Sequence, residues 1–273
     1  MKSPRRRSHR FPIRLVAVLL LFSLLSSCSY SEGPRETTAN ENPSSPTNTK
    51  PTKRVAITFD DGPQCRDGAI YGSNTKMVVD ELNKYGFHAT FFVVGKNIVN
   101  DAGNLKDNGT LSYVVQNGNE IGIHGFSHIN YRDCSDAQYA EEINRTRDAI
   151  HLALPGYNIR VMRPPEGEMT ATRVAQSPYA VIYWDVDSED SRRENQYAKG
   201  DTEEIWTQKV NTIVNNVMSN VKDGDIILLH DLLQSSYDAT VIILQRLKEE
   251  GYDVVTVSEL LGDSLQAGRW YAK

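Results

Sequence analysis

From Arg54 onward, short apolar runs alternate with segments of helical spacing, and this alternation constrains the fold more than any other feature of the chain. The apolar runs are bounded by turn residues, as strands are. They are residues 55–59, 89–94, 120–123, 160–162, 180–184, 225–229 and 253–256. The segments with helical spacing or caps are residues 75–85, 135–154, 168–176, 204–221, 238–250 and 258–262. Strands that alternate with helices are typical of parallel βαβ units, so the sequence predicts an α/β domain.

The number of strands leaves two architectures open. About seven parallel strands in roughly 210 residues fit either an open doubly wound sheet or a barrel slightly smaller than the eight-stranded type. Periodicity does not choose between them. In both, catalytic groups lie at the carboxyl ends of the strands, so the residues that carry chemistry are expected there.

The charge distribution argues against nucleic acid as a partner. All six Lys and Arg residues of the first 27 positions precede any acidic residue, and the rest of the chain carries 24 basic against 35 acidic residues, a net charge of −11. An acidic body repels phosphate backbones. The hydrophobic fraction of 39% and charged fraction of 24% are ordinary for soluble domains, which excludes collagen-like, coiled-coil and multi-span membrane proteins.

The first 28 residues have the layout of an export signal. An Arg-rich start is followed by an uncharged, mostly apolar run from Leu15 to Ser27, shorter than the about 20 residues that a membrane-spanning helix needs. Residues 25–28 (LSSC) resemble the lipobox of bacterial lipoproteins, in which the cysteine, here Cys28, is lipidated and becomes the mature N-terminus. The alternative is a plain signal peptide with a chance cysteine. We expect an exported protein that is lipid-anchored to the cell membrane and faces the envelope.

The sequence divides into four parts. Residues 1–27 are expected to be the lipoprotein signal peptide, and residues 28–53 combine the lipidated cysteine with a linker rich in Ser, Thr, Asn and Pro. Such a linker cannot bury a core, so it is predicted to be disordered. Residues 54–263 are the folded domain, and residues 264–273 are expected to form a C-terminal tail.

Two segments at strand ends could hold a metal ion. Asp60, Asp61 and Gly62 end the first strand, and His124 and His128 follow the third. Taken alone, the acidic pair is more often a simple turn, and a lone histidine pair is a weak signal. Together, two histidines and one aspartate make a ligand set for a catalytic divalent ion with open positions, although non-haem iron oxygenases use the same set.

Three further segments follow later strands. Arg163-Pro164-Pro165-Glu166-Gly167 is a rigid loop whose arginine could clamp a carboxylate. The acidic stretch 187–190 (DSED) would by default be a solvated loop. The apolar run 226–229 ends on His230.

These five segments resemble, in order, the five motifs of polysaccharide deacetylases of the NodB-homology type, carbohydrate esterase family 4. The resemblance covers about residues 54 to 262, and it implies a distorted (β/α) barrel. It also implies roles for single residues. Asp61, His124 and His128 would bind one divalent metal ion, with zinc expected and cobalt, nickel or manganese as alternatives.

The resemblance also assigns the proton transfers. Asp60 would be the general base and His230 the acid that protonates the leaving amine. Supporting roles fall on five residues of the later motifs. Arg163 would position Asp60, Asp190 would orient His230, the backbone N–H of Glu166 after Pro165 would help hold the oxyanion, and Leu228 would line the acetyl pocket.

Three positions depart from the family pattern. Gly125 stands where members commonly have Ser or Thr, Glu166 where an aromatic is common, and Ser191 where a Trp commonly follows the acid. The departures put substrate range and rate in doubt and leave the metal, base and acid residues in place.

The function implied is removal of N-acetyl groups from an extracellular glycan, with N-acetylglucosamine of peptidoglycan as the first expectation. Chitin oligomers, poly-N-acetylglucosamine of biofilms and acetylated xylan are alternatives within the same chemistry. A catalytically weak glycan-binding lipoprotein is an alternative of another class. No protein partner is evident.

Two cysteines remain after Cys28. Cys65 follows the acidic pair, and Cys134 follows the histidine pair. Both would lie in loops that follow strands whose ends share the expected metal site. Export makes a disulfide between them feasible, and two free thiols are the alternative.

Overall fold

The computed structural model describes residues 53–64 and 74–271. The expected signal peptide, Cys28, the linker up to residue 52 and Cys65 lie outside these residues, and what was expected of them stays a prediction. Within the described ranges, no helix is both long and apolar enough to cross a membrane.

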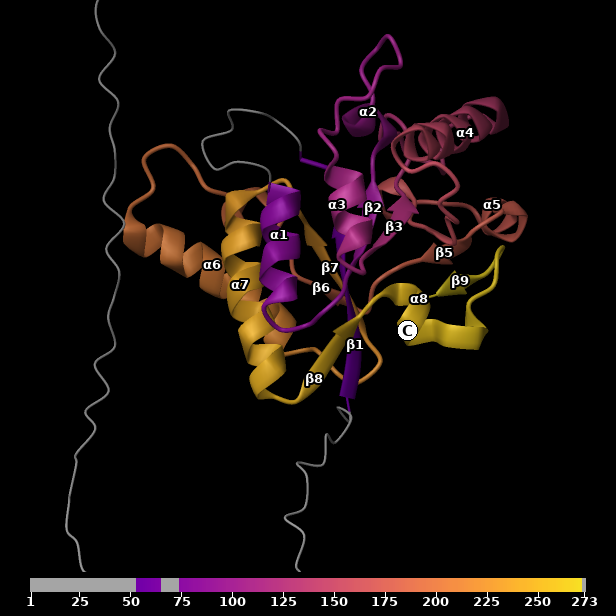
Figure 1. Ribbon diagram of the computed structural model, residues 1–273. Helices are drawn as coiled ribbons and strands as arrows, with labels where there is room; N and C mark the ends of the chain where they lie inside the picture. Colours follow the sequence, from indigo (N-terminus) through magenta and orange to yellow (C-terminus); the bar gives the residue numbers. More distant parts are fainter. Residues whose placement is uncertain (1–52, 65–73, 272–273) are drawn as a thin grey trace, which may run out of the picture. The chain divides into compact units, whose positions relative to one another are not determined.

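Nine strands form one sheet in which every paired strand runs parallel to its neighbour (Figure 1). The order is β6-β7-β1-β2-β3-β4-β5-β9, and β8 pairs with the first half of β1. The strands are β1 (Lys53–Asp60), β2 (Thr90–Val93), β3 (Glu120–Ile123), β4 (Val161–Met162), β5 (Ala180–Ile182), β6 (Val186–Asp187), β7 (Ile226–His230), β8 (Tyr252–Val255) and β9 (Trp270–Tyr271). The sheet curls with helices around it, which confirms the distorted (β/α) barrel.

Side-chain alternation along the strands separates an outer apolar layer from the barrel interior. On β1, Val55, Ile57 and Phe59 belong to the large apolar cluster beneath the helices. Ala56 belongs instead to a small second cluster. Thr58 and Asp60 continue the inward row toward the carboxyl end, so the first catalytic candidate is placed by the strand's two-residue period.

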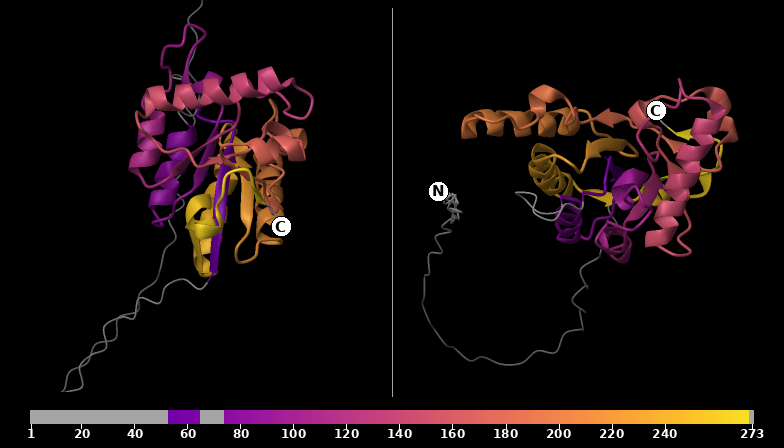
Figure 2. Two further views of the ribbon diagram at one scale, coloured as in Figure 1. Left: turned by 90° about the vertical axis from the view of Figure 1, so that its right-hand side faces the viewer. Right: turned by 90° about the horizontal axis from the view of Figure 1, so that it is seen from above.

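Helices cover the outer face of the curled sheet (Figures 1 and 2). The α-helices of the described residues are α1 (Asn74–Asn83), α2 (Gly95–Ile98), α3 (Thr110–Gln116), α4 (Asp136–Ala153), α5 (Ala171–Gln176), α6 (Glu203–Met218), α7 (Gln234–Glu249) and α8 (Val257–Leu261), of which α8 is not part of this outer layer. Neighbours around the outside pack in the order α6, α7, α1, α3, α4, α2. The left view of Figure 2 shows α4 lying across the end of the sheet at which β1 finishes.

The α8 helix belongs to the interior rather than to this ring. Its Val257 is fully buried in the small cluster with residues of β1, β2, β4, β5 and β7. A capping box of Thr256 and Glu259 begins the helix. Val257, a residue late in the chain, thus completes the inner apolar cluster. The polar inward-facing residues, such as Thr58 and Asp60 of β1, lie closer to the carboxyl ends of the strands.

Two α-helices and two strands of the described residues were not indicated by the sequence. The α2 and α3 helices are short, and neither begins with a side-chain cap. Strands β6 and β9 have two residues each, too few to show a period. The acidic stretch 187–190 therefore begins on a strand, β6. The expected tail, residues 264–273, contributes strand β9, which pairs with β5.

Candidate active site

Asp60 and Asp61 both face the carboxyl end of the barrel. Asp60 is the last residue of β1, and its residue exposure is only 3%. Asp61 has φ of 73°, in the left-handed region that a non-glycine residue enters at a cost of roughly 1 to 2 kcal/mol. This turn brings a second carboxylate to the side on which Asp60 already points.

The histidine pair reaches the same place from β3. His124 Nδ1 lies 2.9 Å from the carbonyl oxygen of Arg163, and because a carbonyl only accepts, Nδ1 carries the proton. The unprotonated Nε2 then faces the carboxylates, 3.6 Å from Asp60 Oδ2 and 3.5 Å from Asp61 Oδ1. His128 Nε2 lies 3.1 Å from Asp61 Oδ1. The hydrogen bond from His124 Nδ1 to the Arg163 carbonyl oxygen is of the type that orients metal-binding imidazoles in proteins.

Asp61, His124 and His128 fit a divalent cation. One ligand atom from each lies within 4.8 Å of the other two. Asp61 Oδ1 is buried and has no hydrogen-bond partner among the described residues, although it faces two imidazole nitrogens. A cation between these atoms would resolve the unpaired oxygen, and three protein ligands leave positions open for water and substrate.

Electrostatics around two of these three ligands favour the forms that bind metal, whereas the hydrogen bond with Asp61 raises the pKa of the third, His128. Burial alone would raise the pKa of Asp61, but His128, His124 and His230 outweigh it and lower this pKa to about 2. Burial lowers the pKa of His124, against the opposing pull of Asp60 and Asp61. An ionised carboxylate and a neutral imidazole are therefore available near neutral pH.

Arg163 holds Asp60 from inside the barrel. The arginine has no exposed surface, and its Nη1 donates to Asp60 Oδ1 at 2.8 Å and to the Thr58 hydroxyl at 2.7 Å. Its other nitrogens donate to the carbonyl oxygens of Ile182 and Tyr183. Removing one partner of such a buried ion pair typically costs about 3 to 5 kcal/mol. Asp60 is thereby fixed in one orientation.

His230 and Asp190 form a second pair beside Asp60. His230 is the register partner of Asp60 on the neighbouring strand β7. Its Nδ1 lies 2.7 Å from Asp190 Oδ1, and its backbone N–H donates to Asp190 Oδ2 at 2.7 Å. Burial lowers the pKa of His230, but Asp190, Asp60 and Asp61 outweigh this and raise it to about 9. The imidazole is thus a proton donor at neutral pH.

The remaining predicted residues lie on the adjoining loops and strand. Pro165 is buried in the turn that contains Glu166, whose φ is 59°. The Glu166 side chain accepts a hydrogen bond from Asn130, 2.9 Å away. Leu228, 5% exposed, lies two residues before His230 on β7 and pairs in register with Thr58. All three positions therefore border the site.

Some residues that support the site gave no signal in the sequence. Asn97 of α2 donates to the carbonyl oxygen of Asp61 at 2.7 Å. The Thr75 hydroxyl donates to Asp231 and accepts from the backbone N–H of Gln64, two residues after Gly62. Glu142 of α4 contacts the loop between the two histidines. Each acts across elements far apart in the chain, so spacing could not reveal it.

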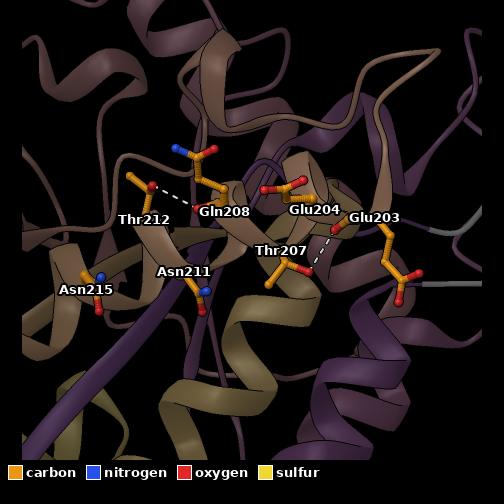
Figure 3. Close-up of a pocket in the computed structure, with 7 residues that line it drawn as sticks. All are labelled: Glu203, Glu204, Thr207, Gln208, Asn211, Thr212 and Asn215. Carbon is orange, nitrogen blue, oxygen red and sulfur yellow. Dashed lines mark hydrogen bonds between the residues drawn. The ribbon is translucent and has the colours of Figure 1, made fainter.

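Two other features lie apart from the metal ligands. Cys134 forms no disulfide with a described residue, and its Sγ lies 3.3 Å from an Arg173 nitrogen; Cys65 lies outside the described residues, so the disulfide stays a prediction. Figure 3 shows a shallow groove lined only by α6 side chains, among them Thr207 and Thr212, whose hydroxyls bond back to carbonyls of the same helix. This groove contains none of the predicted site residues.

The fold and the site define a parallel barrel whose carboxyl end carries a candidate cation site of Asp61, His124 and His128. Comparison with known proteins identifies the family. The family model described as "Polysaccharide deacetylase" matches residues 47–180. The chitooligosaccharide deacetylase of Bradyrhizobium is 30% identical over 185 residues, which are 66% of this chain and 71% of that protein. The chain belongs to the polysaccharide deacetylase family.

Two further relatives extend the comparison. The peptidoglycan-N-acetylmuramic acid deacetylase of Bacillus subtilis is 34% identical over 208 residues, 76% of this chain and 38% of that protein. The solved peptidoglycan deacetylase structure from the same organism has a TM-score of 0.62 at 35% identity, covering 76% of this chain and 89% of the solved one. A family 4 acetyl xylan esterase from Clostridium thermocellum, solved with a cobalt ion, has a TM-score of 0.64 at 29% identity, covering 80% and 98%.

The first curated relatives are longer proteins. The chain spans about two fifths of the length of the Bacillus subtilis protein and of the Listeria monocytogenes peptidoglycan-N-acetylglucosamine deacetylase, which is 29% identical over 222 residues, 81% of this chain.

Proposed function

We propose that the protein is a metal-dependent hydrolase that removes N-acetyl groups from an extracellular glycan. The observation that carries the proposal is the register of β1 and β7, which places Asp60 beside His230. A carboxylate that accepts a proton and an imidazolium that donates one therefore flank the cation ligands. Amide hydrolysis needs both transfers, one from the attacking water and one to the leaving nitrogen.

Asp60 acts in the first half of the reaction. Asp61, His124 and His128 would hold a divalent cation, which would supply polarisation of the acetamide carbonyl and a lowered pKa for the attacking water. Asp60 accepts the proton of the attacking water as the new C–O bond forms. Arg163 occupies Asp60 Oδ1, so Oδ2, which faces His124, is the oxygen left for the proton.

His230 acts in the second half. Its Nδ1 is engaged by Asp190, so Nε2 is the atom that can donate to the amine nitrogen as the C–N bond breaks. The immediate products are the free amino sugar and acetic acid, which keeps the second proton of the water, with one proton gained by Asp60 and one lost by His230. The backbone N–H of Glu166 is proposed to steady the oxyanion from the opposite loop.

Peptidoglycan is the substrate we propose, at its N-acetylglucosamine residues. Support comes from the names of relatives, which include peptidoglycan-N-acetylglucosamine and peptidoglycan-N-acetylmuramic acid deacetylases, and from the exported, lipid-anchored form that we propose from the sequence around Cys28. A short polar linker would keep the domain near the cell wall. Relatives named chitooligosaccharide deacetylase and acetyl xylan esterase make those glycans the alternatives.

The test is mass spectrometry of glycans after incubation with the metal-loaded protein. Muropeptides, chitin oligomers and acetylated xylo-oligomers are offered in parallel, and fragmentation locates any lost acetyl group. We expect loss from N-acetylglucosamine of muropeptides and no loss with the Asp60→Asn variant. Loss from the other glycans only would replace the proposed substrate, and loss from none would refute the deacetylase function.

A further inference from the structure

The loop between the two histidine ligands, residues 125–127, is held from both sides by backbone hydrogen bonds. On one side, the N–H groups of Gly95 and Lys96 at the start of α2 donate to the carbonyl oxygens of Gly125 and Phe126, each at 2.9 Å. These bonds use the loop's acceptors. Its donors must find their partner elsewhere, because buried backbone N–H groups are rarely left unpaired.

Glu142 is that partner. Its Oε2 accepts from the backbone N–H of Phe126 at 2.7 Å and from that of Ser127 at 2.8 Å, and its Oε1 accepts from the Ser127 hydroxyl at 2.6 Å. Glu142 has an exposure of 7% and lies on α4, which begins with a capping box at Ser135. One carboxylate therefore receives three hydrogen bonds from the two residues that separate Gly125 from His128.

The same helix makes a second contact with the loop. The guanidinium carbon of Arg145 lies 3.7 Å from the centre of the Phe126 ring, on the side of the loop that α4 approaches. Gly125 is tightly enclosed: a Cβ there would lie 2.7 Å from the Tyr131 hydroxyl and 3.2 Å from Glu142 Oε2, at a φ of 79°. In this chain there is no room for a larger residue at 125, and the loop's hydroxyl is that of Ser127.

We infer that Glu142 is a positioning residue for the metal site, which fixes the spacing of His124 and His128 by holding the loop between them. Its carboxylate touches neither the cation ligands nor the substrate pocket in the contacts above, so its effect passes through the loop backbone. This inference rests on the proposed function only in taking Asp61, His124 and His128 as cation ligands. Residues that orient ligands typically contribute 10- to 100-fold to metal affinity.

The test measures Zn²⁺ affinity by competition with a chromogenic chelator, without any glycan. Glu142→Ala should bind Zn²⁺ about 10- to 100-fold more weakly than the wild type. Glu142→Gln should recover most of the affinity, since one amide oxygen can accept both backbone N–H groups. Glu141→Ala is the matched control, because Glu141 is the exposed neighbour on the same helix and pairs with Arg145. Its affinity should equal that of the wild type.

A purely structural Glu142 gives a different pattern. Then Glu142→Ala would melt at a lower temperature yet bind Zn²⁺ as tightly as the wild type, and that result would overturn the inference. If Glu142→Ala does not fold, Ser127→Ala decides, because it removes only the hydroxyl bond to Oε1. Weaker Zn²⁺ binding by Ser127→Ala supports the inference, and unchanged binding overturns it. Because the Zn²⁺ affinity measurement uses no substrate, its result can be interpreted even if the glycan assay shows no deacetylation.

Discussion

Replacing Asp190 by Asn should move the alkaline limit of activity to lower pH. Asp190 is fully buried and accepts two hydrogen bonds from His230, one from the backbone N–H and one from Nδ1. The two donors bond to different oxygens of Asp190, and an Asn side chain would place its NH₂ group against one of them. It also removes the largest influence that raises the pKa of His230, and burial then acts to lower it.

The size of the shift follows from the two pKa values. The pKa of His230 is raised from 6.5 to about 9, so at pH 7.5 nearly every molecule carries the acidic proton. If the pKa falls to 6.5 or below, at most about one tenth carries it at that pH. A bound cation lowers both values, so the difference between the variants persists. We expect the alkaline limit to fall by about two and a half pH units, with a rate lower by about tenfold at pH 7.5.

The assay is kcat/KM for acetate release across the alkaline range, with both proteins saturated by the same metal. Glu189→Gln is the control, because it removes one charge next to Asp190 without touching His230. A second check is the double variant: in a His230→Gln background, adding Asp190→Asn should change the rate little, since the two residues act as one unit. An alkaline limit that stays in place in Asp190→Asn would refute the assignment of His230 as the acid.

Four further predictions concern other residues. Asp60→Asn should keep its metal and lose roughly 10² to 10⁴ of the rate, and near-normal turnover would contradict its role as base. Chelation should abolish activity and added Zn²⁺ restore it; an active preparation without metal in elemental analysis would exclude the site. Cys28→Ala should release the protein from membranes or block processing, whereas unchanged fractionation and acyl labelling would indicate another anchor. Unfolded, unreduced protein should show no thiol at Cys65 and Cys134 if they are bridged; two reactive thiols would exclude the bridge.

The long elements of the fold could be predicted because their signals are local. The apolar run that became β1 and the capped segment that became α4 differ from the structure by two residues or fewer at each end. Strands β6 and β9 could not be predicted, because two residues are held by pairing with β7 and β5 rather than by their own composition. Long-range pairing leaves no period in the sequence.

The same distinction applies to the site. Asp60, Asp61, His124 and His128 stand next to strand ends, so their residue types and their positions along the chain were enough to indicate a common site. Glu142 lies within a regular helical segment and gave no such sign. Its importance arises only where α4 crosses the end of β3, which depends on how the helices pack.

The last described strand, β9, covers the edge of the sheet that β5 would otherwise form. The N–H groups of Val181 on β5 and of Tyr183 just after it donate to the carbonyl oxygens of Arg269 and Tyr271, and the Trp270 ring stacks on Tyr183 with centroids 3.9 Å apart. A chain cut short before Arg269 would present those N–H groups on a bare edge, which is a template for strands of other molecules. We therefore expect β9 to limit self-association. Forms that end before Arg269 should aggregate, although every candidate catalytic residue remains in place.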